Sequence, residues 1–95
     1  MEIKGNTLIK KSSDLMEASL GESLALMSVE SGKYFGMNQV AKHIWQELGS
    51  EISVENLIKN LTEKFDVDRQ TCYDECEEFL RKLLEKKMIS LRYAG

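Results

Sequence analysis

The stretch "SGKYFGMNQVAKHIWQEL", residues 31–48, changes from a strand pattern to a helix pattern at Asn38. The residues from Lys33 to Met37 predict a short aromatic strand, and the segment after Asn38 is an amphipathic helix. Because side chains alternate between the two faces of a strand, the adjacent aromatics Tyr34 and Phe35 must point to opposite faces. The two rings therefore cannot lie in one core, and one face of this strand must have another use.

Two turn signals place this strand at the edge of a sheet. The segments Thr7–Lys11 and Leu15–Leu20 are extended candidates, and Gly21-Glu22 is a two-residue hairpin turn. The next segment, Ser23–Glu30, is apolar on both faces, which is typical of a central strand. Ser31-Gly32 then makes a second tight turn. We expect a three-stranded antiparallel meander with the aromatic strand on one edge.

Three helices are predicted after the meander, so that one α+β domain covers residues 1–95. Their expected N-caps are Asn38, Ser53 and Asp68, and Gly49 stands where the first helix would need its C′ residue. The third helix should reach about Lys86. The core-facing residues that we expect in the first two helices are Val40, Ala41, Ile44, Trp45 and Leu48, then Val54, Leu57, Ile58, Leu61 and Phe65.

The third helix has a wider apolar surface than one packing contact needs. Its line through Cys72, Cys76, Phe79 and Leu83 can face the other helices. A second line, rotated around the helix, passes through Tyr73, Cys76, Leu80 and Leu84. This second line either lies against the sheet or faces a ligand, and the periodicity does not decide between the two. Residues 88–93 are an apolar tail of undetermined conformation.

The edge strand is weakly protected against pairing with another chain. Its only charge is Lys33, and Gly36 allows another backbone to approach closely. With Phe35 and Met37 pointing to the core, Tyr34 and Gly36 point the other way. Such an edge beside a helix with spare apolar surface suits the addition of an extended peptide as a further strand. Two alternatives stay open, namely a homodimer edge and an edge covered by the first ten residues.

Composition argues against several classes of protein, although a local basic patch could still exist. The chain of 95 residues has 13 basic and 16 acidic side chains, a formal net charge of −3, which offers no electrostatic footprint for nucleic acid. It has no apolar run of the roughly 18 residues that a membrane span needs and no signal-peptide pattern at its start. Its two cysteines favour a reducing compartment. We therefore expect a cytoplasmic protein without a membrane or nucleic-acid partner.

No catalytic residue, metal or cofactor is predicted. Cys72 and Cys76 share a helix face, but His43 is the sole further soft ligand, which is too few for a tetrahedral zinc site. Their spacing also differs from the C-x-x-C redox motif. A Cys–His catalytic pair would need an oxyanion arrangement that the sequence does not indicate. Buried thiols are the simpler interpretation.

The order and spacing of these features resemble the PqqD-like family of leader-peptide-binding proteins, the recognition elements for precursors of ribosomally synthesised peptide products. The resemblance covers roughly residues 24–89, and no single motif in it is diagnostic. It is carried by Gly32, Tyr34-Phe35, Met37-Asn38, Ile44-Trp45, Val67-Asp68, Phe79-Leu80, Leu83 and Met88-Ile89.

The resemblance implies a winged-helix-like fold and a non-enzymatic adaptor. The leader peptide would add antiparallel to the strand 33–37 in a groove shared with the helix 68–86, for delivery to a leader peptidase, a cyclase or a radical SAM enzyme. The sequence "SGKYFGMN" looks most like that of the proteins of lasso-peptide clusters. A homodimer is also compatible with the exposed edge. The expected leader-binding residues are Lys33, Tyr34, Phe35, Gly36, Met37, Tyr73, Cys76, Glu77, Leu80, Arg81 and Leu84.

Two other classes compete with the peptide adaptor. A winged-helix DNA-binding regulator shares the gross architecture, but the first half of the third helix is acidic, and phosphate would be repelled. A small metal or redox protein lacks ligands. For the adaptor, the sequence predicts that Gly36→Pro or a charged residue at Leu80 abolishes leader binding and leaves the fold intact.

Overall fold

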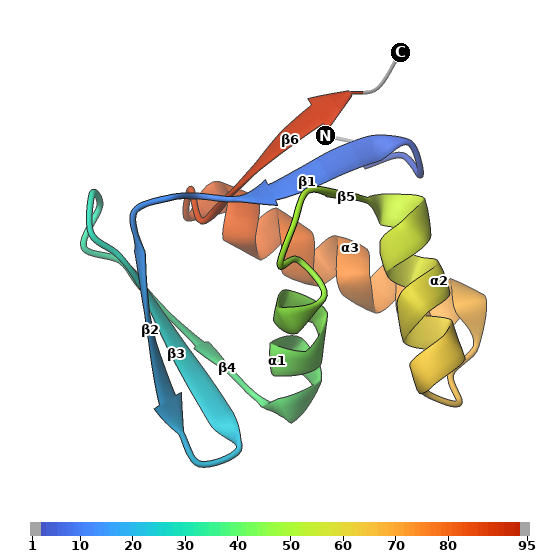
Figure 1. Cartoon of the computed structure of the whole chain (residues 1–95), viewed down its shortest axis with the longest axis horizontal. Helices are drawn as coiled ribbons and strands as arrows, with labels where there is room; N and C mark the ends of the chain where they lie inside the picture. Colours follow the sequence, from blue (N-terminus) through green and yellow to red (C-terminus); the bar gives the residue numbers. More distant parts are fainter. Residues whose placement is uncertain (1–2, 94–95) are drawn as a thin grey trace.

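The computed structural model describes residues 3–93, which form two three-stranded antiparallel sheets and three helices (Figure 1). None of these helices is both long and apolar enough to cross a membrane. In chain order the elements are β1 (Thr7–Lys11), β2 (Leu15–Leu20), β3 (Ser23–Ser28), β4 (Tyr34–Met37), α1 (Gln39–Gln46), β5 (Ile52–Ser53), α2 (Val54–Lys64), α3 (Arg69–Glu85) and β6 (Ile89–Tyr93).

The predicted meander is confirmed as the sheet β2-β3-β4, with β3 in the centre. Leu20 pairs with Ser23 across the two-residue turn, where Gly21 has a φ of 67°. The second turn contains Gly32 at a φ of 71°, a conformation that glycine adopts without strain. β3 ends at Ser28, two residues before the predicted end, because the chain turns from Val29 onwards.

The second sheet, β5-β1-β6, was not predicted. β1 pairs with β6 along its whole length, from Thr7 opposite Tyr93 to Lys11 opposite Ile89. The tail returns because α3 ends in a Schellman motif: the Met88 N–H donates to the Leu83 carbonyl oxygen at 2.9 Å. This pairing joins the two ends of the chain, so a local sequence pattern cannot predict it.

All three predicted N-caps are confirmed, whereas some of the predicted helix faces are wrong. The side chains of Asn38, Ser53 and Asp68 each accept a hydrogen bond from the backbone N–H three residues ahead. Helix α1 already ends at Gln46, so Gly49 is not its C′ residue.

Two side chains predicted to be buried are instead exposed. Val40 is 58% exposed and Phe65 is 40% exposed. Val40 lies in the first turn of α1, and Phe65 is the C-cap of α2, so both are at helix ends where less structure covers them. Both flank the hollow described below.

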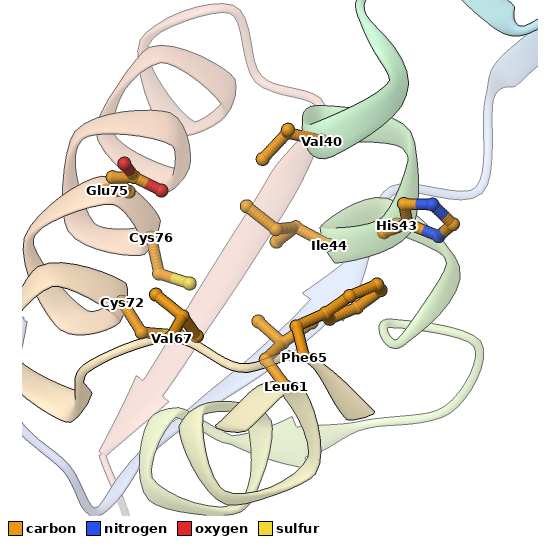
Figure 2. A pocket seen from close by; sticks show the side chains of 9 residues that line it. All are labelled: Val40, His43, Ile44, Leu61, Phe65, Val67, Cys72, Glu75 and Cys76. Atoms are coloured by element: carbon orange, nitrogen blue, oxygen red, sulfur yellow. The ribbon is translucent and has the colours of Figure 1, made fainter. Parts of the chain in front are cut away.

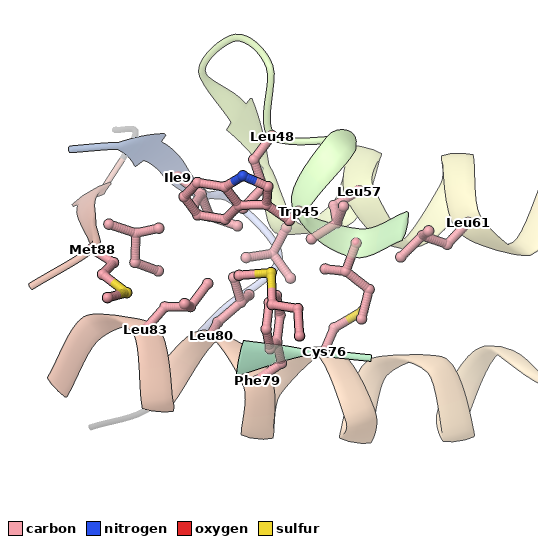
Figure 3. Close-up of a cluster of buried hydrophobic side chains, with 14 of the residues drawn as sticks. Ile9, Trp45, Leu48, Leu57, Leu61, Cys76, Phe79, Leu80, Leu83 and Met88 are labelled. Atoms are coloured by element: carbon pink, nitrogen blue, oxygen red, sulfur yellow. The ribbon is translucent and has the colours of Figure 1, made fainter. Parts of the chain in front are cut away.

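The core lies between the two sheets and the helices, and Trp45 joins its parts (Figure 3). Trp45 is 1% exposed, as predicted. Its indole N–H donates to the Glu17 carboxylate of β2 at 3.2 Å, and the Lys11 ammonium of β1 lies 4.2 Å from its ring centroid. Burial lowers the pKa of Lys11, and the charge of Glu17 opposes this effect. The Trp45 side chain of α1 thus contacts both sheets.

The cap of α3 predicts a pH-dependent stability. Hydrogen bonds from the backbone N–H and the hydroxyl of Thr71 hold the pKa of the Asp68 carboxyl below its usual range. The stabilisation is therefore present above the unfolded-state pKa of about 4 and is lost as the pH falls through the lower folded-state pKa. We expect Asp68→Ala to lower the Tm at pH 7 and to have no effect in strong acid.

Thermal unfolding followed by circular dichroism across this pH range would test the cap. Asp68→Ser is the matched control, because serine caps a helix without an acid titration. A Tm difference between wild type and Asp68→Ala that persisted in strong acid would contradict this role of the carboxylate.

Candidate functional site

The outer edge of β4 presents backbone groups that no described strand pairs with. The Lys33 carbonyl oxygen accepts a hydrogen bond from the Ser28 N–H at 2.9 Å. This bond determines which residues of β4 direct their backbone groups toward β3. In an antiparallel ladder, alternate residues bond to the neighbouring strand. The N–H and C=O groups of Tyr34 and Gly36 therefore point away from β3 and are available to an added strand.

The two faces of β4 differ as the sequence predicted. Met37 is buried and Phe35 is half-buried, whereas the Tyr34 side chain is 69% exposed. A Cβ atom added to Gly36 would meet no atom within 4 Å, so the space beside its backbone is open. The free edge is therefore accessible both to hydrogen-bonding partners and to a bulky neighbour.

A groove runs between this edge and helix α3. The Phe35 and Phe79 rings meet edge to face, with centroids 5.7 Å apart, and connect the strand to the helix. The start of α1 closes one end of the groove. The residues that line it are Phe35, Gly36, Asn38, Val40, Ala41, Ile44, Glu75, Glu78, Phe79 and Lys82.

The helix wall of the groove carries more acid than base. Glu75 and Glu78 lie there together with Lys82, whose ammonium is 3.5 Å from the Glu78 carboxylate. Both side chains of this pair are largely exposed, so the ion pair adds little stability and can exchange partners. A guest with a basic side chain beside α3 would find an unpaired carboxylate in Glu75.

An apolar hollow of about 230 Å³ continues the groove between α1, α2 and α3 (Figure 2). It shares Val40, Ile44 and Glu75 with the groove. Phe65 closes one side and stacks at a tilt on the His43 ring, with centroids 5.0 Å apart. The remaining lining residues are Leu61, Val67, Cys72 and Cys76. The hollow can receive an apolar side chain of a molecule that lies in the groove.

The family model described as coenzyme PQQ synthesis protein D (PqqD) matches residues 23–89. The chain belongs to the PqqD family. The matched span begins at β3 and contains β4, all three helices and thus the whole of the groove and the hollow. No protein of curated function matches this PqqD-family chain.

Two solved structures share its fold. One, described as TbiB1 in complex with the TbiA(beta) leader peptide, has 28% sequence identity and a TM-score of 0.75, and the similarity covers 90% of this chain and 99% of that one. The other, described as lasso peptide synthetase B1 complexed with the leader peptide, has 20% identity and a TM-score of 0.68 over 86% of this chain and 96% of that one. The second similarity concerns the fold alone.

The structure of this PqqD-family chain corrects the helix face predicted to line the groove. Leu80 is 0% exposed and lines neither the groove nor the hollow, whereas Cys76, which is 1% exposed, lines the hollow but not the groove. The other predicted positions on α3 (Tyr73, Glu77, Arg81 and Leu84) are absent from the groove lining, and at about 100° per residue they lie on the opposite side of the helix. Residues 75, 78, 79 and 82 form the wall instead.

The second sheet explains this correction. The Tyr73 hydroxyl donates a hydrogen bond to the Ile3 carbonyl oxygen, and α3 packs against β6. The second apolar line of α3 therefore faces the N-terminal segment and the β5-β1-β6 sheet, and it is part of the core. The alternative that the first ten residues cover β4 is not supported by residues 3–10, because β1 pairs with β5 and β6, while residues 1 and 2 lie outside the described residues. A periodic sequence pattern identifies the two apolar lines but not which sheet each one meets.

The two thiols of this PqqD-family chain are poor nucleophiles. Both cysteines are free and buried. Burial raises the pKa of Cys76 strongly and that of Cys72 as well. Because the thiolate is the reactive form and the metal-binding form, a raised pKa lowers the reactivity of both thiols at neutral pH. Within residues 3–93 no group of three His, Cys, Asp or Glu side chains is placed to hold a metal ion.

Proposed function

We propose that this chain is a non-catalytic adaptor that binds the leader peptide of a ribosomally synthesised precursor by strand addition to β4. One observation carries the proposal: the outward-facing backbone groups of Tyr34 and Gly36 adjoin a groove, in a chain whose structural relative TbiB1 was solved with a leader peptide. Strand addition to an open edge is an established mode of peptide recognition. The proposed function would occupy the single domain 1–95.

Main-chain hydrogen bonds would hold the leader whatever its sequence. A strand added to β4 exchanges N–H···O bonds with Tyr34 and Gly36, and Lys33 and Met37 bound the length of this edge. If the guest runs antiparallel to β4, its N-terminal part lies beside Met37 and the start of α1. That part of the leader then reaches the apolar hollow, which supplies selectivity.

The side chains proposed to contact the leader are those of the groove and the hollow. In the groove they are Phe35 of the strand and, on α3, Glu75, Glu78, Phe79 and Lys82. Tyr34, exposed on the other face of β4, would contact a side chain of the added strand from that face. Val40 and Phe65, which are exposed apolar side chains beside the hollow, would contact an apolar residue of the leader. The mixed but mainly acidic wall favours a leader with a basic residue next to α3.

The bound precursor would be delivered to a maturation enzyme in the cytoplasm. A leader peptidase is the partner that we propose, because the stretch "SGKYFGMN" resembles the proteins of lasso-peptide clusters. Two free, buried cysteines fit a reducing compartment. The DNA-binding alternative has no support, because the groove side of α3 presents the carboxylates Glu75 and Glu78, which would repel phosphate.

Isothermal titration calorimetry with a synthetic leader would test the proposal. The peptide is the leader of a short precursor open reading frame to be sought beside this chain's gene, and a scrambled peptide of the same composition is the control. We expect one leader to bind per chain and the scrambled peptide to bind at least 10-fold more weakly, since selectivity comes from the pockets. Equal affinity for both peptides, or no binding of either, would contradict the proposed function.

The hollow yields a more specific prediction. We expect Val40→Glu to weaken leader binding about 10-fold, because an apolar contact worth about 1–2 kcal/mol is replaced by a charge. Stability should hardly change, because Val40 is 58% exposed and an acid in the first turn of a helix is favourable. Gln39→Glu adds the same charge outside the groove and is the matched control. Equal affinities of the two variants would show that the hollow is empty in the complex.

A further inference from the structure

The outer face of the β2-β3-β4 sheet, turned away from the helices, is uncharged. It is built from two complete cross-strand rows, Met16–Met27–Tyr34 and Ala18–Ala25–Gly36, with Leu20 and Ser23 as a third pair. Met16, Leu20 and Tyr34 are 58%, 65% and 69% exposed. The opposite face of the same strands contributes Leu24, Leu26 and Met37 to the core. This sheet therefore has apolar side chains on both faces, although only one of the faces is covered.

No element of residues 3–93 packs on the outer face. Helices α1 and α3 lie on the other side of the sheet, and the β2-β3 hairpin projects away from the body of the protein (Figure 1). The small side chains of the Ala18–Ala25–Gly36 row make a flat centre, with larger apolar side chains on both sides. Contiguous exposed apolar patches rimmed by polar residues mark interaction surfaces.

The rim of the outer face is acidic at both ends. Glu22 lies in the hairpin turn at one end, and Asp14 and Glu30 lie together at the other, where the Asp14 carboxylate accepts a hydrogen bond from the Glu30 N–H. Lys33 is the one basic residue in the strand connections, residues 12–14, 21–22 and 29–33. A second copy stacked on this face would bring acid to acid whichever way it was turned. A partner whose own rim is basic complements it.

The outer face is continuous with the proposed leader-binding edge, since Tyr34 and Gly36 belong to both. A leader strand added to β4 would widen the sheet, and every second leader side chain would extend the outer face. We infer that the outer face is the docking surface for the maturation enzyme. The enzyme would contact it through an apolar patch of its own that is rimmed by basic side chains. This inference rests on the proposed function and adds how the enzyme would contact the adaptor and the leader at the same time.

The test variant is Ala18→Arg, which places a long cation in the flat centre of the outer face. Ala18 is exposed, so the fold should tolerate the substitution. Ser19→Arg is the matched control: it adds the same side chain to the next residue, which is also exposed but points to the other face. Circular dichroism melts would verify that both variants fold.

Docking is measured by biolayer interferometry, first without the leader, using one at a time the purified maturation enzymes identified from the genes around that precursor. We expect one of them to bind wild type and Ser19→Arg, to bind Ala18→Arg at least 10-fold more weakly, and to dissociate faster as salt rises. Equal binding of Ala18→Arg, no binding of any enzyme, or a dimer in sedimentation that Ala18→Arg abolishes would overturn the inference. Leader affinity, measured separately, should be equal in all three proteins. If the wild-type protein did not bind the leader, that result would instead contradict the proposed function.

Discussion

Gly36→Pro is expected to lower the affinity for the leader about 100-fold. Proline removes the Gly36 N–H, which points to the free side of β4, and leaves a carbonyl of the guest without its donor. A lost hydrogen bond of about 1 kcal/mol and an unsatisfied acceptor of about 1–3 kcal/mol together give an effect of this size. The fold should survive, because Gly36 donates no bond to β3 and proline is tolerated on edge strands.

Calorimetry with the synthetic leader measures this effect, and Gly36→Ala is the matched control. Alanine keeps the N–H, and its Cβ atom would meet nothing within 4 Å. The affinity of Gly36→Ala should therefore stay within about 3-fold of wild type, a difference of under 1 kcal/mol. If the proline variant folds and binds as tightly as the alanine variant, the leader does not bond to this edge.

Leu80→Glu is expected to unfold the protein and not merely to abolish binding. Leu80 is 0% exposed in the core between α3 and the two sheets (Figure 3). The substitution removes a packed side chain and introduces a carboxyl without a partner, which we expect to cost about 5 kcal/mol or more. A loss of this size equals the whole stability at the lower end of the range for a domain of this size, about 5–14 kcal/mol. This expectation replaces the sequence-based hypothesis that a charge at this position leaves the fold intact.

Urea denaturation followed by tryptophan fluorescence measures the loss, since Trp45 is buried in the same core. Leu84→Glu, one turn further along α3, is the matched control. Leu84 is half-buried at the margin of the core, so we expect a loss of about 1–2 kcal/mol. If Leu80→Glu were as stable as wild type, the placement of α3 against the β5-β1-β6 sheet would be wrong.

The features that the sequence predicted correctly are local ones. The N-caps Asn38, Ser53 and Asp68 depend on a side chain and an N–H three residues away. The meander depends on two short turns, and the opposite orientations of Tyr34 and Phe35 depend on strand alternation alone. Each of these follows from stereochemistry within a few residues, which is why the open edge strand could be identified without a structure.

The helix side of the groove could not be predicted because it depends on contacts between distant segments. The apolar lines on α3 were recognised, but both are buried, one of them against a sheet that joins β1 to β6. The pattern therefore predicts a ligand contact at Leu80, which is instead part of the core. In the sequence, the wall residues Glu75 and Glu78 resemble an ordinary solvated helix face. Phe79, whose ring meets that of Phe35, is the apolar wall residue on α3 that indicates on which side the groove lies.

Amide hydrogen exchange by NMR tests the central claim most directly, with ¹⁵N-labelled protein and the synthetic leader. In the free protein, the amides of Phe35 and Met37 are bonded to β3, and those of Tyr34 and Gly36 face the open edge. Strand addition predicts that the leader slows exchange at Tyr34 and Gly36 at least 10-fold relative to Phe35 and Met37. Binding that left the Tyr34 and Gly36 amides exchanging as fast as in the free protein would contradict it.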